Sequence, residues 1–112
     1  MYIYKAHVVS VYDGDTITVD IDLGFDTILK NQKIRLYGIN TPEMRGLNKV
    51  QGTSSRDALR GRVLGKDITI ETIQDKKEKF GRWLGKIEIN GENINNWMVA
   101  NKFAIIFMDD GE

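Results

Sequence analysis

The sequence predicts a mainly β protein with helices (α+β), built as a five-stranded barrel with two helices packed against it. Short runs in which apolar and polar residues alternate recur along the chain, and two other stretches carry apolar residues at helical spacing. Short, numerous strands favour a barrel, because closure leaves few exposed sheet edges. The length of 112 residues, 41% of them apolar, suits one domain spanning residues 1–112.

Three strands are expected in the first 40 residues. The run "TITVDIDL" alternates throughout and gives a half-buried strand. Its apolar face consists of Ile17, Val19, Ile21 and Leu23. The stretch "KAHVVSVY" before it is β-rich but less regular, and "DGD" joins the two strands. Turns are expected at Gly24 and at "KNQ", followed by a third strand that Ile34, Leu36 and Ile39 mark.

The rest of the chain predicts a helix, two strands and a second helix. The glycine-containing stretch "EMRGLNKVQGT" indicates a mobile exposed loop. Ser54 is then expected to cap a helix over about 55–64, which Gly65 ends. Strands follow in "DITIETI" and "RWLGKIEI", and "NG" at 90–91 predicts a hairpin turn. Asn95 is expected to cap the second helix, whose apolar face carries Ile94, Trp97 and Met98.

The charges are unevenly distributed although the formal net charge is zero. Residues 30–66 carry nine Lys and Arg against two acidic groups, a net charge of +7, whereas residues 1–29 carry −4 and residues 67–112 carry −3. A basic middle segment suits a polyanionic partner, and accidental clustering on a solvated surface is the alternative. The chain has no cysteine, so any metal must use oxygen ligands or the single histidine, His7.

The sequence contains no apolar run long enough to span a membrane and no recognisable signal peptide. We therefore expect a cytoplasmic protein without a membrane partner. The longest apolar run, "FAIIFM" near the end, is expected either to fold back on the barrel or to mediate a weak homodimer.

Several residues are candidates for chemistry, each with a structural alternative. Asp13 and Asp15 either form an ordinary turn or present a carboxylate to a hard cation such as calcium. Arg35, inside a strand, either pairs with a carboxylate or binds a phosphate. Glu43 follows the rigid Pro42 and is better placed than a glutamate on a flexible loop, although surface solvation is its alternative. We take His7 as structural.

Three separated motifs occur in order: "VYDGDTITV", "IRLYGINTPE" and "KFGRWLGKIEINGENIN". Together they resemble the staphylococcal nuclease (thermonuclease) family over about residues 4–104. The resemblance implies an oligonucleotide/oligosaccharide-binding (OB-fold) barrel with helices packed against it. It also implies calcium-dependent, largely sequence-nonspecific hydrolysis of DNA and RNA phosphodiesters that leaves 3′-phosphate ends.

The resemblance assigns roles residue by residue. It implies that the metal is held by Asp15, Asn40 and the backbone carbonyl of Thr41. It implies that the phosphate is bound by Arg35 and Arg82 and that Glu43 activates or orients the water. Such a set makes chemical sense, because the transition state gathers negative charge that fixed cations stabilise, and a carboxylate can take the proton of the attacking water.

This chain departs from the family pattern in a few places. Asn40 stands where aspartate is common, which keeps an oxygen donor but removes one negative charge and predicts weaker calcium binding. Phe80 stands where tyrosine is usual and keeps only a stacking face, and Glu78 replaces an aspartate. We also expect the family's C-terminal third helix to be absent.

The substrate is expected to be DNA or RNA, preferably single-stranded, because a shallow barrel face with one aromatic platform suits unpaired bases. Arg45 and Lys49 lie in the basic loop and are expected to contact the substrate strand. Calcium is the expected cofactor, and other divalent ions are alternatives. The competing functions are a noncatalytic nucleic-acid-binding module, with Asn40 as the sign of lost turnover, and a structural or protein-binding barrel.

Overall fold

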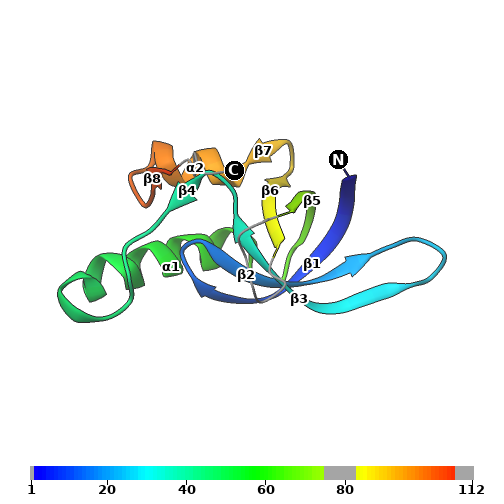
Figure 1. The fold of residues 1–112 in the computed structure, drawn as a ribbon, viewed down its shortest axis with the longest axis horizontal. Helices are drawn as coiled ribbons and strands as arrows, with labels where there is room; N and C mark the ends of the chain where they lie inside the picture. The colour runs from blue at the N-terminus through cyan, green and yellow to red at the C-terminus, as the bar shows by residue number, and fades with distance from the viewer. Residues whose placement is uncertain (1, 75–82, 108–112) are drawn as a thin grey trace.

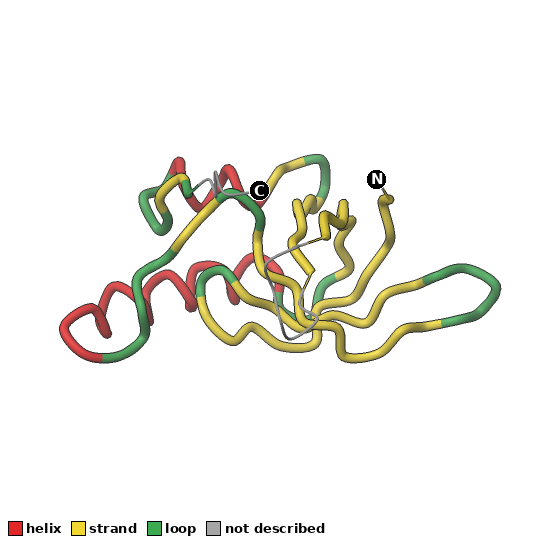
Figure 2. The backbone as a smooth tube through the Cα atoms, viewed as in Figure 1, coloured by secondary structure: helices red, strands yellow, loops and turns green. Residues whose placement is uncertain are grey.

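Five strands form a closed barrel in the computed structural model, which describes residues 2–74 and 83–107 (Figures 1 and 2). The barrel strands are β1 (Tyr2–Asp13), β2 (Thr16–Asp22), β3 (Ile28–Leu36), β5 (Asp67–Gln74) and β6 (Trp83–Ile89). Their order is β3-β2-β1-β5-β6, with antiparallel neighbours throughout. A short parallel pairing of β3 with β6, from Ile34 opposite Trp83 to Leu36 opposite Gly85, closes the barrel. The predicted fold class is therefore confirmed.

Alternation sets the inner face of β2 as expected. Ile17, Val19 and Ile21 are all buried, because side chains at every second position of a strand face the same side. The predicted face is one residue too long, since β2 ends at Asp22 and Leu23 is exposed.

The turn predicted at "KNQ" is wrong, because these residues lie inside β3. The register opposite β2 shifts there: Val19 pairs with Gln32, but Ile21 pairs with Leu29. Asn31 takes a left-handed backbone (φ 57°), and its N–H donates to Asp20 Oδ1 at 2.9 Å. The turn-forming residues thus make a β-bulge within one long hairpin, which projects away from the barrel in Figure 1.

The first helix is longer than predicted. A short strand β4 (Ile39–Asn40) is followed by a 3₁₀ turn η1 (Gly46–Asn48) and helix α1 (Lys49–Val63). The expected mobile loop is thus largely helical, and Ser54 lies inside the helix instead of capping it. The helix ends at Val63, and the expected stop signal Gly65 follows its C-cap Leu64 with φ +73°.

The second helix, α2 (Ile94–Ala100), follows a hairpin between β6 and β7 (Glu92–Asn93). Asn90 and Gly91 both have positive φ, 51° and 81°, as the predicted "NG" turn requires. The predicted cap is wrong by two residues, because Asn93 accepts the hydrogen bond from the Asn96 N–H. Ile94 and Met98 are buried as expected.

A last short strand, β8 (Ile105–Ile106), pairs antiparallel with β4. The Phe107 N–H donates to the Gly38 carbonyl at 2.8 Å, which extends this contact by one residue. Segment 105–107 therefore lies against the strand that leads to the "NTPE" motif, and its side chains are largely exposed. Within the described ranges, no helix is long and apolar enough to cross a bilayer.

The core joins the barrel to both helices. Its largest fully buried side chains come from all five barrel strands and from α1 and α2. They include Ile17, Ile34, Leu36, Ile70, Ile87, Leu59, Ile94 and Met98. Gly85 leaves room at the barrel closure, because a Cβ there would lie 2.8 Å from the side chains of Ile34 and Ile70. Burial of these apolar surfaces fixes both helices against the strands.

Candidate functional site

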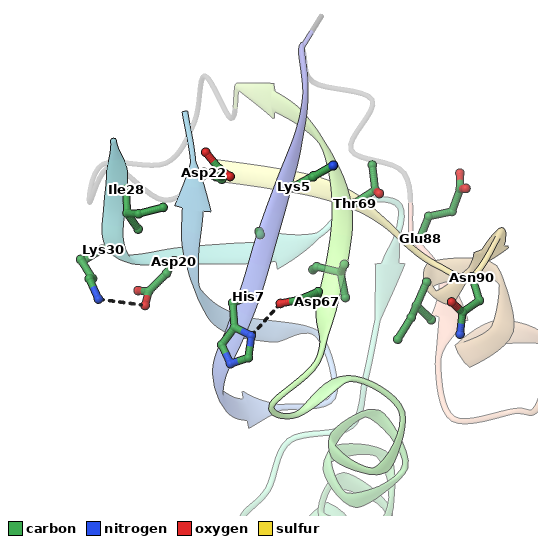
Figure 3. Close-up of a pocket in the computed structure, with 13 residues that line it drawn as sticks. Lys5, His7, Asp20, Asp22, Ile28, Lys30, Asp67, Thr69, Glu88 and Asn90 are labelled. Carbon is green, nitrogen blue, oxygen red and sulfur yellow. Dashed lines mark hydrogen bonds and ion pairs between the residues drawn. The ribbon is translucent and has the colours of Figure 1, made fainter. Parts of the chain in front are cut away.

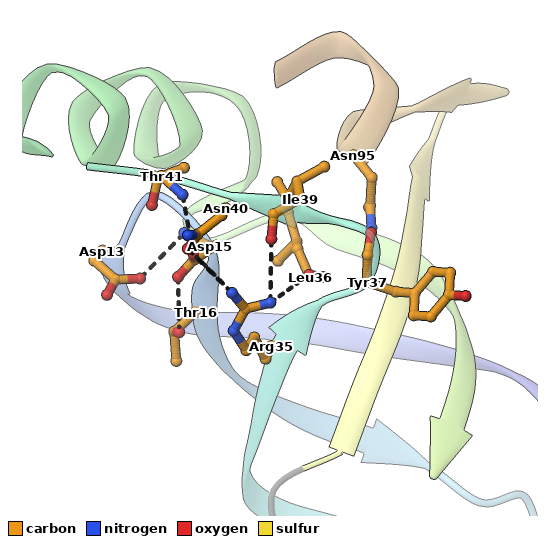
Figure 4. A network of polar contacts seen from close by, with 10 residues as sticks. All are labelled: Asp13, Asp15, Thr16, Arg35, Leu36, Tyr37, Ile39, Asn40, Thr41 and Asn95. Atoms are coloured by element: carbon orange, nitrogen blue, oxygen red, sulfur yellow. Dashed lines mark hydrogen bonds and ion pairs between the residues drawn. The ribbon is translucent and has the colours of Figure 1, made fainter. Parts of the chain in front are cut away.

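Three chain segments meet at one end of the barrel (Figure 4). The β1–β2 turn supplies Asp15, the end of β3 supplies Arg35, and β4 with the residue after it supplies Asn40 and Thr41. The Leu36 N–H donates to the Asp15 carbonyl at 2.7 Å, which ties the turn to the end of β3. Four of the residues that the sequence singled out are therefore brought together.

The carboxylate of Asp15 is held by three donors and is almost fully buried, with 9% of its side chain exposed. Oδ1 accepts from the Thr16 hydroxyl at 3.2 Å. Oδ2 accepts from the Thr41 N–H at 3.2 Å and from Arg35 Nη2 at 3.5 Å. The contact observed for Thr41 is thus made by its amide nitrogen, whereas the expected role used its carbonyl oxygen.

Arg35 turns its guanidinium toward the protein, with 18% of its side chain exposed. Nη1 donates to the backbone carbonyls of Leu36 at 3.3 Å and Ile39 at 3.1 Å. Nη2 donates to Asp15 Oδ2 and, at 3.2 Å, to Asn40 Oδ1. Of the two sequence-based alternatives for Arg35, the pairing with a carboxylate is the contact that the structure contains.

Gly14 has a role beyond turn formation. A Cβ at this position would lie 2.8 Å from Ser55 Cβ in α1 and 2.9 Å from Thr41 Cγ2. The turn therefore lies directly against the helix and the site, and only glycine allows this approach. With any larger residue, the turn, Ser55 or Thr41 would have to shift.

Asp13 supports the turn and carries a perturbed carboxyl group. Its Oδ1 accepts from the Asp15 N–H at 3.1 Å. Burial, followed by the neighbouring Asp15 carboxyl, raises the pKa of Asp13 from 3.8 to about 6. The folded protein therefore holds this proton more tightly than the unfolded chain does.

Replacing Asp13 by Asn is expected to stabilise the metal-free protein at neutral pH. A pKa raised on folding means that stability falls as pH rises from 3.8 toward 6, with the full penalty above that window. A shift of this size corresponds to at most about 3 kcal/mol, and partial exposure reduces it to about 1 kcal/mol. Asn keeps the acceptor oxygen. Urea unfolding with chelator should show the gain at pH 7 and almost none at pH 4, and an equal gain at both pH values would contradict the assignment.

The Glu43 side chain is exposed. The Glu43 backbone is held in place by its close packing against Gly52 of α1. A Cβ on Gly52 would lie 2.2 Å from the Glu43 carbonyl oxygen and 2.8 Å from that of Pro42. The chain thus crosses α1 at a position where glycine alone fits. Within residues 2–74 and 83–107 no hydrogen bond or ion pair joins the Glu43 side chain to Asp15 or Arg35.

No hydrogen bond or ion pair in the described part of the chain joins Arg45 or Lys49 to the site residues Asp15, Arg35 and Asn40. Arg45 precedes η1 and Lys49 begins α1, and both are exposed. Arg82 and Phe80 lie outside the described residues, so their expected roles stay predictions.

The side-chain oxygens of Asp15 and Asn40 suit a divalent cation in that both already point at one positive charge. Asp15 Oδ2 and Asn40 Oδ1 come from different strands, yet both accept from the same Nη2 atom of Arg35. Two oxygen donors therefore converge on one positively charged group. Among the described residues no cluster of three His, Cys, Asp or Glu side chains could hold a metal. A site here would therefore need the amide oxygen of Asn40 and backbone or substrate oxygens as well.

A pocket of about 690 Å³ lies elsewhere on the barrel (Figure 3). Its lining includes a hydrogen bond between His7 Nδ1 and Asp67 Oδ1 at 2.8 Å and an ion pair between Lys30 and Asp20 at 3.7 Å. None of the predicted site residues lines it. His7 has a surface pairing role, in agreement with its structural interpretation.

The sequence interpretation missed two residues that shape the site. The sequence predicts a loop at Gly52, although residues 52, 55, 59 and 63 have the spacing of one buried helix face. The sequence predicts Asn95 as a cap, but its buried amide bridges β6 and Tyr37, the residue that follows β3. Its Oδ1 accepts from the Ile87 N–H at 3.0 Å, and its Nδ2 donates to the carbonyls of Tyr37 at 2.9 Å and Gly85 at 3.0 Å. No sequence signal distinguished these partners from a cap.

The sequence matches the family model described as staphylococcal nuclease homologue over residues 33–111. A thermonuclease from Staphylococcus hyicus is 31% identical over 104 residues, covering 86% of this chain and 58% of the thermonuclease. Protein ParB from Escherichia coli is 31% identical over 109 residues, covering 89% of this chain and 55% of ParB. The uncharacterized protein MJ1439 from Methanocaldococcus jannaschii is 32% identical over 134 residues, covering 97% and 62%. The chain thus spans only 55% to 62% of these relatives' lengths.

Proposed function

Because this chain belongs to the staphylococcal nuclease homologue family, we propose that it is a metal-dependent nuclease that hydrolyses phosphodiester bonds in DNA and RNA. The proposal includes calcium as cofactor, little sequence preference and 3′-phosphate ends. The observation that carries it is the convergence of Asp15 Oδ2 and Asn40 Oδ1 on the Arg35 guanidinium. Oxygen donors for a cation and a cation suited to phosphate occupy one small region.

The charges of this region suit the reaction. A phosphodiester is an anion, and its negative charge on the non-bridging oxygens increases in the transition state. A divalent cation bound by Asp15 and Asn40 would supply positive charge and neutralise these oxygens. The planar guanidinium of Arg35 can donate two parallel hydrogen bonds to the same phosphate. Such fixed positive charge stabilises the transition state most where water is partly excluded.

Glu43 is the proposed proton acceptor for the attacking water. Pro42 restricts the backbone before it, and the contact with Gly52 fixes that backbone against α1. The side chain itself is exposed, so it is accessible to water and substrate. A carboxylate placed on a fixed backbone beside the phosphate can accept a proton during in-line attack.

The substrate is proposed to be DNA or RNA in single-stranded form. Arg45 and Lys49 are exposed near the start of α1 and would attract the phosphate backbone, with an affinity that falls as salt rises. Phe80 is the proposed stacking surface for an unpaired base.

Digestion of single-stranded DNA and of RNA, each with calcium or with chelator, tests the proposal. We expect cleavage only with the metal, products that accept extension only after phosphatase treatment, and faster cleavage of single strands than of duplexes. Parallel reactions in magnesium and manganese identify the effective ion. An absence of metal-dependent cleavage would contradict the proposal.

The second candidate is a noncatalytic nucleic-acid-binding module. Asn40 favours it, because the amide contributes no charge to the donor set. Filter binding that persists without any cleavage, and that does not change in Glu43→Ala, would support this alternative.

Asn40→Asp is expected to bind calcium about tenfold more tightly than the wild type, because a second carboxylate increases the ligand charge that sets calcium affinity. Titration calorimetry measures this directly. A matched control is Asn96→Asp, which adds the same charge at an exposed position of α2. An affinity unchanged by Asn40→Asp would show that residue 40 is not a ligand.

A further inference from the structure

The guanidinium of Arg35 has nearly all its donors engaged by the protein. An arginine side chain has five N–H groups, of which four are on the two Nη atoms. Four acceptors surround those atoms: the carbonyls of Leu36 and Ile39 at Nη1, and Asp15 Oδ2 and Asn40 Oδ1 at Nη2. A phosphate could therefore receive two Nη hydrogen bonds from Arg35 only after some of these contacts break.

The acceptors at Nη2 are the oxygens proposed for the metal. Calcium binds its oxygen ligands at about 2.3–2.6 Å, so it cannot share their point of convergence with a guanidinium nitrogen. The formal charge of the trio is also balanced already, since Asp15 contributes −1, Arg35 contributes +1 and Asn40 is neutral. A dication would thus enter a region that has a cation in place.

We propose that Arg35 is an internal counter-cation that competes with the metal for Asp15 and Asn40, and that metal binding releases its Nη2 donors for the substrate phosphate; this inference rests on the proposed function. Metal and phosphate then bind with positive coupling. A phosphate that draws Arg35 outward frees the metal ligands, and a metal that takes the ligands frees Arg35. Such coupling between two binding events is reciprocal by necessity.

This competition has a specific consequence for Asn40. An amide oxygen contributes no charge against the dication, so the single carboxylate of Asp15 is shared between Arg35 and the metal. The free protein therefore holds calcium weakly and assembles its metal site mainly when nucleic acid is present. Calcium binding, nucleic acid binding and the transfer of Arg35 to the phosphate are therefore coupled.

Calorimetric titration of calcium into the wild type and Arg35→Gln tests this inference without any turnover. Gln removes the positive charge but keeps an amide group able to donate to nearby carbonyls. We expect Arg35→Gln to bind calcium about tenfold more tightly, within the range of ordinary coupling energies. The matched control is Arg60→Gln, which removes the same charge from an arginine that donates to the Val11 carbonyl at 3.2 Å. It should change the affinity less than about twofold, because its charge is screened by solvent.

The competition would be overturned if Arg35→Gln bound calcium no more tightly than the wild type. It would also be overturned if Arg35→Gln and Arg60→Gln gained the same calcium affinity, or if neither variant bound calcium. Thermal unfolding with and without chelator verifies that each variant is folded. Nitrogen-15 NMR of the arginine side chains provides a second readout on the wild type. The Arg35 signals should report restricted rotation without calcium and faster rotation at saturating calcium, and unchanged signals would contradict release.

The two proposals fail in different ways. A calcium-stimulated nuclease whose Arg35→Gln variant binds calcium no more tightly keeps the proposed function and loses the competition. A protein whose Arg35→Gln variant gains affinity, but which cleaves no nucleic acid, keeps the competition as a property of a binding module.

Discussion

Glu43→Gln is expected to lower the rate of phosphodiester cleavage by about 10²–10⁴-fold, the usual contribution of a positioned acid or base. Gln has the same size but cannot accept the proton of the attacking water. The exposed side chain makes no described contact that stabilises the fold, so the thermal unfolding temperature should stay almost constant. Single-turnover cleavage of a fluorescent single-stranded oligonucleotide measures the effect.

The matched control is Glu88→Gln, which removes a carboxylate from an exposed position of β6 that, like His7, lines the separate pocket. It should cleave at nearly the wild-type rate. Calcium affinity should also change little in Glu43→Gln, which separates proton transfer from metal binding. Full cleavage by Glu43→Gln would remove Glu43 from the chemistry.

Gly52→Ala is expected to reduce cleavage by about 10²-fold, because a displacement of about 1 Å at a catalytic group has effects of this size. The added Cβ would lie 2.2 Å from the Glu43 carbonyl oxygen and 2.5 Å from its carbonyl carbon. Backbone atoms cannot turn aside as a flexible side chain can, so the segment that carries Glu43 must move. The overlap should also destabilise the fold by about 1–3 kcal/mol, as overpacked cores do.

Gly61→Ala provides the control in the same helix. Gly61 is exposed, and among the described residues a Cβ there meets nothing within 4 Å. Alanine should therefore stabilise the protein by about 1 kcal/mol through its higher helix propensity and leave cleavage unchanged. Similar activities for Gly52→Ala and Gly61→Ala would show that the contact between α1 and the Glu43 backbone does not position the catalytic group.

The sequence predicted the elements whose residues carry a local signal. The alternation of β2 and the "NG" turn before β7 depend on neighbours in the chain; the turn is correct, and the alternation is correct as far as Ile21. Turn-forming residues misled the interpretation where tertiary contacts decide their use. Asn31 uses its left-handed backbone in a bulge, and Gly52 serves a close contact inside α1. Their local preferences are the same as in a loop, so the sequence alone could not distinguish them.

In the candidate site, too, the sequence identified residues but not the tertiary contacts that they make. Family resemblance identified Asp15, Arg35 and Asn40, and the fold places them together. It could not predict the direction in which Arg35 points, because that depends on the backbone carbonyls of Leu36, at the end of β3, and of Ile39. It also could not predict the bridging role of Asn95, whose three partners lie 8, 10 and 58 residues away.

The pairing of β8 with β4 has a consequence for protein synthesis. Asn40 lies opposite Ile105, and the Ser55 hydroxyl donates to the Phe103 carbonyl at 2.6 Å. The strand that presents Asn40 thus acquires its partner only after residues 103–106 have been synthesised. A nascent chain that ends before Phe103 lacks both contacts, so we expect the position of Asn40 to be fixed only late in synthesis.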